Sequence, residues 1–217
     1  MDNGWVMDDA ARQPEWVWYV SYGSNMARRR FDCYLSGGTP PGAQRIYPGC
    51  RNRTAPTRIR PCSIPGGVYF ATYSPVWNGG RAFLDVALPE TTPATAYLIT
   101  AGQFADVAAQ EMYRDPGADV DLRAVLTNGR DQLGPGRYET LQYLGNVDGY
   151  PLLTFTAPWS AADVEPVPPS AAYLRMLAIG LRDTHGWTVA DTAEHLAHRP
   201  GARGNWTAGS IAAAISS

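Results

Sequence analysis

The hydrophobic pattern of the chain predicts a domain that mixes strands and helices. Short runs of β-branched and aromatic residues, bounded by Gly, Pro or Asn, are typical of strands, and apolar residues three and four positions apart are typical of helices. We expect strands at residues 16–20, 68–73, 81–87, 95–100, 137–144 and 152–156, and helices at 101–113, 122–126, 170–184 and 190–198. Residues 27–65 are rich in Gly, Pro and Arg without a clear period, so most of them are expected to be irregular. Residues 206–215 fit a short terminal helix or a tail.

The number and spacing of the predicted strands indicate a fold class. A sheet of at least five strands joined by short turns buries its edges best by closing. We therefore expect an α+β fold in which a small mixed β-barrel is flanked by helices. Asn78-Gly79 is a strong turn signal between two of the strands. Thr100 can cap the helix at 101–113, with Gln103 as its capping-box partner.

The first predicted strand ends in a turn of small and polar residues, Tyr22-Gly23-Ser24-Asn25-Met26. Gly23 supplies freedom in φ, and successive N–H groups at Gly23, Ser24 and Asn25 can converge on a carboxylate or a developing oxyanion. The same residues also fit an ordinary turn after an edge strand.

Glu111 is the candidate catalytic residue. Phe104, Val107 and Ala108 share one face of the helix at 101–113, and Glu111 follows on that face at i+7. A carboxylate on an apolar face is partly desolvated, which suits it to proton transfer. The alternative is that Glu111 lies in solvent at the helix end or pairs with Arg114.

These motifs, in this order along the chain, resemble the γ-glutamylcyclotransferase family. The turn at 22–25 looks like its substrate-binding loop, and the strand at 96–100 with the helix at 103–111 looks like the segment that ends in its catalytic glutamate. Further similarity lies in residues 65–83 and 169–181, and the whole resemblance covers residues 16–187. It divides the chain into an N-terminal extension at 1–15, a γ-glutamylcyclotransferase-like domain at 16–187 and a C-terminal helical extension at 188–217.

The resemblance implies an activity and a set of site residues. A γ-glutamyl amide would be cyclised to 5-oxoproline with release of an amine, and no cofactor would be needed because the attack is intramolecular. Glu111 would move the proton, the turn from Tyr22 to Met26 would bind the substrate, and Tyr138 would close the pocket. A non-catalytic metabolite-binding module, or an enzyme that acts on another amide in tailoring or acyl transfer, remains an alternative.

The segment Met112–Gly136 is longer than the corresponding loop of the family, which makes it a candidate determinant of the leaving amine. It carries Arg114 and Arg130, which can present positive charge to the half of the substrate that the turn at 22–26 does not reach. The alternative is a solvated excursion.

Composition narrows the class of partner. The 217 residues suffice for one sizeable core, and the net charge of −2 with a pI of about 5.9 gives no global field toward nucleic acid or an anionic membrane. A small-molecule γ-glutamyl partner fits better. Cys33, Cys50 and Cys62 show no Cys-x-x-Cys spacing, which speaks against a disulfide framework and a structural zinc site. No apolar run reaches the roughly 18 residues of a membrane span, and residues 1–15 lack a signal-type stretch, so we expect a cytoplasmic protein.

Overall fold

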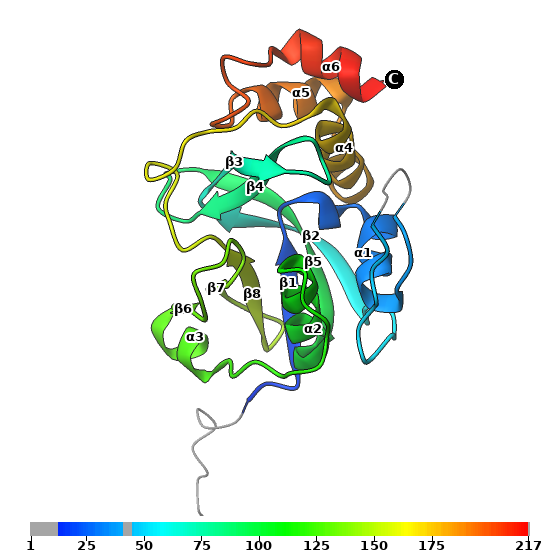
Figure 1. The fold of residues 1–217 in the computed structure, drawn as a ribbon, viewed down its shortest axis with the longest axis vertical. Helices are drawn as coiled ribbons and strands as arrows, with labels where there is room; N and C mark the ends of the chain where they lie inside the picture. Colours follow the sequence, from blue (N-terminus) through cyan, green and yellow to red (C-terminus); the bar gives the residue numbers. More distant parts are fainter. Residues whose placement is uncertain (1–12, 41–44, 217) are drawn as a thin grey trace, which may run out of the picture.

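A six-stranded mixed sheet forms the centre of the computed structural model, which describes residues 13–40 and 45–216 (Figure 1). Its order is β2-β5-β1-β8-β7-β6. Central strand β1 pairs antiparallel with β5 and parallel with β8. The bounds are β1 Trp16–Ser21, β2 Arg58–Pro65, β5 Thr91–Thr100, β6 Arg130–Gln132, β7 Thr140–Val147 and β8 Tyr150–Thr156. Strands β3 (Gly67–Ser74) and β4 (Gly79–Asp85) form a separate hairpin, with Asn78 at a φ of 54° in its turn, as the Asn-Gly signal predicted.

The α+β class is confirmed, but no closed barrel is detected in the part of the chain that the structure describes. The two outer strands explain why the sheet stays open there. Strand β2 carries Pro61 and Pro65, which lack the N–H that a further strand would need, and places Arg58 and Arg60 in solvent. Strand β6 has three residues, too few to form a long ladder.

Six α-helices and one short 3₁₀ turn occupy the described residues. They are η2 Ser24–Met26, α1 Arg28–Ser36, α2 Ala101–Glu111, α3 Arg123–Asn128, α4 Ala171–His185, α5 Val189–Ala197 and α6 Ala208–Ser216. Helix α1 and strand β2 both fall within residues 27–65, so the prediction that most of that stretch is irregular was wrong for these two elements. Helix α1 forms because Phe31, Tyr34 and Leu35 make a short apolar stripe that packs into the core.

The sheet separates two apolar cores. Alternate residues of β1 point to opposite faces. Val17 and Tyr19 pack with residues of α1 and α2, whereas Trp18 and Val20 pack with the β3–β4 hairpin and α4. All four are at most 3% exposed, as expected for a strand covered on both faces. Helices α1 and α2 therefore lie on one face of the sheet, and the hairpin and α4 lie on the other (Figure 1).

The C-terminal helices join the second of these cores. Leu196 of α5 and Ile211 of α6 are buried in one cluster with Leu177 and Leu181 of α4. Most of the predicted N-terminal extension, residues 1–12, lies outside the described residues. Within the described ranges, none of the helices combines the length and the apolar character that a membrane crossing requires.

Candidate active site

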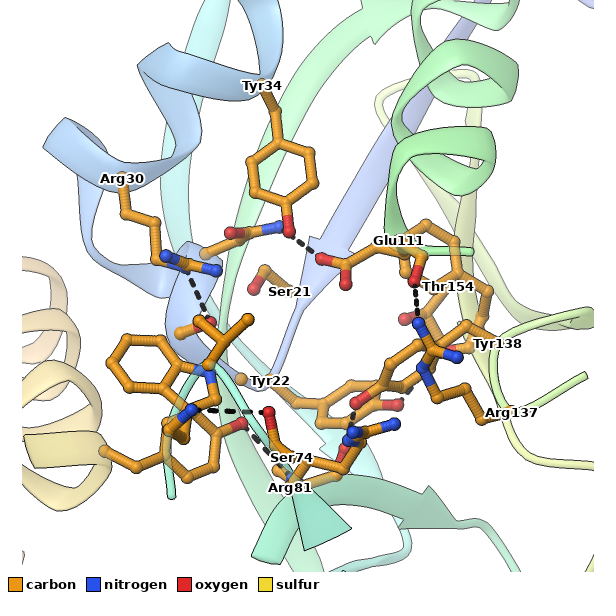
Figure 2. Close-up of a pocket in the computed structure, with 18 of the residues that line it drawn as sticks. Ser21, Tyr22, Arg30, Tyr34, Ser74, Arg81, Glu111, Arg137, Tyr138 and Thr154 are labelled. Carbon is orange, nitrogen blue, oxygen red and sulfur yellow. Dashed lines mark hydrogen bonds between the residues drawn. The ribbon is translucent and has the colours of Figure 1, made fainter. Parts of the chain in front are cut away.

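A pocket opens where β1 ends, between helices α1 and α2 and the loop that joins β3 to β4 (Figure 2). The turn after β1 forms its base, the end of α2 forms one side, and Ser74, Val76 and Trp77 of the hairpin loop form another. Most side chains that sequence reasoning selected line this one cavity. They are Tyr22, Gly23, Ser24, Asn25, Glu111 and Tyr138.

The turn after β1 is a buried 3₁₀ turn held from below. The hydroxyl of Tyr97 donates to the carbonyls of Asn25, at 2.8 Å, and Met26, at 3.0 Å. This fixes the Asn25 side chain at the base of the pocket. Met26, in contrast, does not line the pocket, because its side chain packs in the core beneath α4. Met26 therefore lies outside the pocket that the other predicted substrate-binding residues line.

Gly23 was expected to supply freedom in φ, but in the structure its role is to leave space. Its φ is −113°, a value that any residue adopts, so the turn does not use the conformational freedom of glycine. A Cβ at this position would lie 3.4 Å from the hydroxyl of Tyr173, a residue of α4 that also lines the pocket. The missing side chain leaves room between the turn and that hydroxyl.

Helix α2 carries Glu111 to the turn. The predicted capping box is present, because the Thr100 hydroxyl accepts from the Gln103 amide and the Gln103 side chain accepts from the Thr100 amide. At the other end, Asn25 Nδ2 donates to Glu111 Oε1 at 3.0 Å, and the carboxylate points into the cavity (Figure 2). Arg114 pairs with Glu139 instead, so the alternative pairing of Glu111 with Arg114 is not what the structure shows.

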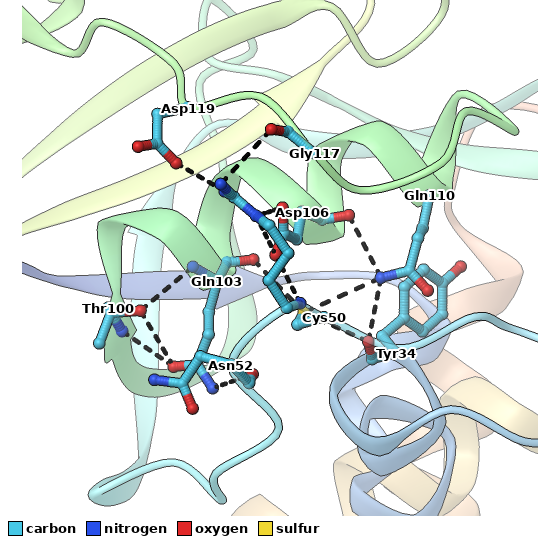
Figure 3. A network of polar contacts seen from close by, with 10 residues as sticks. Tyr34, Cys50, Asn52, Thr100, Gln103, Asp106, Gln110, Gly117 and Asp119 are labelled. Carbon is cyan, nitrogen blue, oxygen red and sulfur yellow. Dashed lines mark hydrogen bonds and ion pairs between the residues drawn. The ribbon is translucent and has the colours of Figure 1, made fainter.

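A polar network joins α2 to α1 and to the segment between α1 and β2 (Figure 3). Gln110 Nε2 donates to the carbonyl of Tyr34 at 3.0 Å, and Arg51 donates to the buried carboxylate of Asp106 through its amide and its Nε, both at 2.9 Å. Because Gln110 precedes Glu111, these bonds restrict where the catalytic candidate lies. Sequence reasoning missed the network, because it joins segments more than 50 residues apart.

Arg30 brings a buried positive charge to the pocket. It is 3% exposed, and it donates to Ser24 Oγ at 2.9 Å and to the Tyr47 hydroxyl at 2.8 Å. The ring of Trp77 lies 4.7 Å from its guanidinium carbon. Its Nη1 is buried and has no hydrogen-bond partner among the described residues. A buried donor of this kind calls for an anionic or polar ligand atom.

Three tyrosine hydroxyls surround the base of the cavity. Tyr22 donates to the carbonyl of Phe155 and Tyr138 donates to the carbonyl of Ala82, both at 2.9 Å, so these two act as walls. The hydroxyl of Tyr173 accepts from the Ala82 amide at 3.2 Å, which leaves its proton for another acceptor. Burial raises the pKa of Tyr173 to about 12, so this side chain is a neutral hydrogen-bond donor at physiological pH.

The insertion reaches the site through residues other than those predicted. Arg130 donates to the carbonyl of Pro158 at 2.9 Å, and neither it nor Arg114 lines the pocket. Tyr113, within the insertion, and Arg137, directly after it, do line the pocket. No group of three or more His, Cys, Asp or Glu side chains able to hold a metal ion occurs within residues 13–40 and 45–216.

Solved structures show which fold this is. A human structure described as uncharacterized protein loc79017 is 15% identical with a TM-score of 0.50, and the alignment covers 94% of this chain and 99% of that one. A solved γ-glutamyl cyclotransferase is 14% identical with a TM-score of 0.49, covering 93% and 99%. The chain shares the fold of the human structure. YkqA from Bacillus subtilis gives a TM-score of 0.39 at 13% identity, covering 88% of this chain and 56% of that one. At 15% identity, the likeness to the human structure shows a shared fold and no activity.

Sequence comparisons find one similar protein, and this similarity does not assign an activity to the chain. No family model matches the chain. Histone deacetylase 5 of Arabidopsis thaliana is 32% identical over 183 residues, which cover 76% of this chain. The chain spans 28% of that protein's length, so the activity in that protein's name is not assigned to this chain.

Proposed function

We propose that the protein cyclises a γ-glutamyl amide to 5-oxoproline and releases an amine. One observation carries the proposal: Glu111 is the sole carboxylate among the described residues that line the pocket, and Asn25 of the turn holds it at 3.0 Å. Two motifs that lie 86 residues apart in the sequence thus meet in one cavity. That convergence is what a reaction with one proton-transferring carboxylate requires.

Glu111 alone can make all the proton transfers that the reaction requires. The carboxylate takes a proton from the α-ammonium group, and the free amine attacks the γ-carbonyl carbon to form a five-membered ring. Glu111 returns this proton to the leaving nitrogen, the tetrahedral oxyanion collapses, and the bond to that nitrogen breaks. The ring nitrogen gives up its second proton through the regenerated Glu111 carboxylate to the released amine, so the products are 5-oxoproline and an ammonium ion. Asn25 donates to Oε1 and so keeps the carboxylate oriented during these transfers. Because attack is intramolecular, holding the chain folded supplies much of the rate.

The remaining pocket groups match the charges of such a substrate. Arg30 offers its buried Nη1 to a carboxylate of the glutamyl half. The neutral hydroxyl of Tyr173, next to Gly23, offers a hydrogen bond to the oxyanion. Ser24 and Asn25 at the start of η2 also line the pocket, and the first amides of a helical turn have no partner within that turn.

The test replaces Glu111 with a side chain of nearly the same shape that cannot accept a proton. Purified parent and Glu111→Gln proteins are incubated with γ-glutamyl amides, and 5-oxoproline is measured. We expect the variant to lose more than about 100-fold in rate while still binding substrate, as general-base removal predicts. Glu165→Gln, at an exposed position outside the pocket, serves as the matched control and should retain parental activity.

Two results would contradict the proposal. Activity of Glu111→Gln within about tenfold of the parent would remove Glu111 from the proton transfer. Binding of γ-glutamyl compounds without 5-oxoproline from either protein would make the chain a binding module.

A further inference from the structure

The side chains that line the pocket carry a strong excess of positive charge. Four guanidinium groups line it, against the single carboxylate of Glu111. The four residues are Arg30, Arg45, Arg81 and Arg137. Elsewhere on the molecule Arg51, Arg114 and Arg123 each pair with a carboxylate. Among the described residues, none of the four pocket arginines forms an ion pair with Asp or Glu. An unpaired cluster of this size favours a ligand with more negative than positive charge.

Two of these arginines stand at the mouth, beside the catalytic candidate. Arg45 Nη2 donates to the carbonyl of Gln110 at 3.0 Å, and Arg137 Nη2 donates to the carbonyl of Glu111 at 2.7 Å. Both guanidiniums also contact the ring of Tyr113, at 4.1 and 4.4 Å from its centroid. These contacts use one N–H of each guanidinium, which has five, and they fix its position at the end of α2.

Tyr113 lies at the rim of the pocket. It takes the left-handed conformation that commonly ends a helix, with a φ of 60°, and the Arg114 amide behind it donates to the carbonyl of Ala109 at 3.0 Å. Tyr113 is 49% exposed, so its ring is not part of the core. The two guanidiniums lie over this ring, and all three residues line the pocket.

The position of the charges assigns them to the leaving half of the substrate. The glutamyl half carries one ammonium and one carboxylate, which Arg30 and the turn can receive at the base of the cavity. The ammonium and the carboxylate of the glutamyl half cancel in charge, so this half does not need the other arginines. Arg45 and Arg137 lie beyond Glu111 at the rim, where the leaving amine of a cyclising substrate would extend.

We infer that Arg45 and Arg137 are specificity-determining residues that select a leaving amine with a negatively charged side chain. The preferred substrates are then γ-glutamyl conjugates of acidic amino acids. This inference rests on the proposed function, and it concerns which amide is cleaved rather than whether cleavage occurs.

The sharpest test compares two dipeptides of equal size, γ-glutamyl-glutamate and γ-glutamyl-glutamine. They differ by one carboxylate against one amide in the leaving half. We expect kcat/KM to favour γ-glutamyl-glutamate by roughly ten- to a hundred-fold, the range of a charge-assisted hydrogen bond. The preference should shrink as ionic strength rises, because the rim is exposed to solvent.

Substitutions of Arg45 and Arg137 test whether these residues cause the preference for γ-glutamyl-glutamate. Arg45→Gln and Arg137→Gln should each reduce the ratio of the two kcat/KM values toward one, mainly by slowing γ-glutamyl-glutamate. Since both arginines also bind the end of α2, Arg137→Lys is included to keep the charge, and it should keep most of the preference. Arg123→Gln is the matched control, because Arg123 is exposed and pairs with Asp121 away from the pocket.

The outcomes separate this inference from the proposed function. Equal turnover of both dipeptides, or an unchanged ratio in Arg45→Gln and Arg137→Gln, would overturn charge selection and leave cyclisation standing. If the parent forms no 5-oxoproline, calorimetric binding decides. Tighter binding of γ-glutamyl-glutamate that is lost in Arg137→Gln would support charge selection without catalysis, and the absence of binding would overturn both.

Discussion

Substitution of Gly180 by alanine tests how closely helix α4 packs on the substrate-binding turn. A Cβ at Gly180 would lie 2.4 Å from the Cβ of Met26, 3.0 Å from its carbonyl carbon and 3.1 Å from the nitrogen of Ala27. Carbon atoms in good contact are about 3.5 Å apart, so either α4 or the turn must move by about 1 Å. Two of the three atoms belong to the backbone, and a change of side-chain rotamer cannot relieve the contact.

The expected loss of stability follows from two opposing terms. Alanine is favoured over glycine inside a helix by about 0.5–1 kcal/mol, whereas overpacking a core costs about 1–3 kcal/mol. The free energy of unfolding should therefore fall by about 1–2 kcal/mol. For a chain of this size that corresponds to a decrease in Tm of roughly 2–8 °C. A 1 Å displacement of the turn that holds Asn25 should also reduce the rate of 5-oxoproline formation, by up to about 100-fold.

Gly209→Ala provides the matched control. Gly209 also lies in a helix, but the nearest atom to a Cβ there is Thr207 Oγ1 at 3.9 Å, so the alanine meets no obstacle. We expect this variant to be as stable as the parent or up to about 1 kcal/mol more stable. Urea unfolding of the three proteins measures the difference. If Gly180→Ala matched Gly209→Ala in both stability and rate, the close packing of α4 on the turn would be refuted.

Two further predictions concern the support of the turn and the C-terminal helices. Tyr97→Phe leaves the buried carbonyls of Asn25 and Met26 without the hydroxyl that donates to both. We expect the free energy of unfolding, measured in urea, to fall by about 1–3 kcal/mol. The control Tyr143→Phe, at a partly exposed position, should be nearly as stable as the parent. Burial lowers the pKa of His195 from 6.5 to about 4, so the unfolded chain binds the extra proton between these values, and stability should fall as pH decreases from 6.5 to 4. At about 1.4 kcal/mol per pH unit the loss would reach about 3 kcal/mol, and a His195→Gln variant with the same slope would contradict it.

The parts of the site that local patterns encode could be predicted from the sequence. Helix α2 begins at a capping box and presents one apolar face, and both signals lie within a dozen residues. The turn at 22–25 follows a strand whose composition is unambiguous. Glu111 could therefore be placed at the end of a helix on its buried side before any tertiary contact was known.

The rest of the site depends on contacts between distant segments. Arg30 is buried because Tyr34, Tyr47 and Trp77 surround its guanidinium, and nothing next to it in the sequence distinguishes it from Arg28 or Arg29. Helix α1 carries a single short apolar stripe in an Arg-rich stretch, which is too weak a period to predict. The barrel was expected from strand number alone, whereas edge residues such as Pro61 and Pro65 in β2 decide whether a sheet continues.

The meeting of Glu111 with Asn25 follows from a match of lengths. Strand β5 ends at Thr100 opposite Trp16, the first residue of β1, and Thr95 of β5 pairs with Ser21, the last residue of β1. Helix α2 starts directly after β5 and packs along β1 through Phe104 and Val107.

Five steps along β1 span about 17 Å, and ten steps along α2 span about 15 Å. A helix that starts beside the beginning of β1 therefore ends beside the turn that follows it. Loss of one helical turn would draw the carboxylate back by about 5 Å, beyond the reach of any hydrogen bond to Asn25. The distance between the two motifs is thus set by the number of residues between Thr100 and Glu111, which is why a spacing in the sequence can specify a site in the fold.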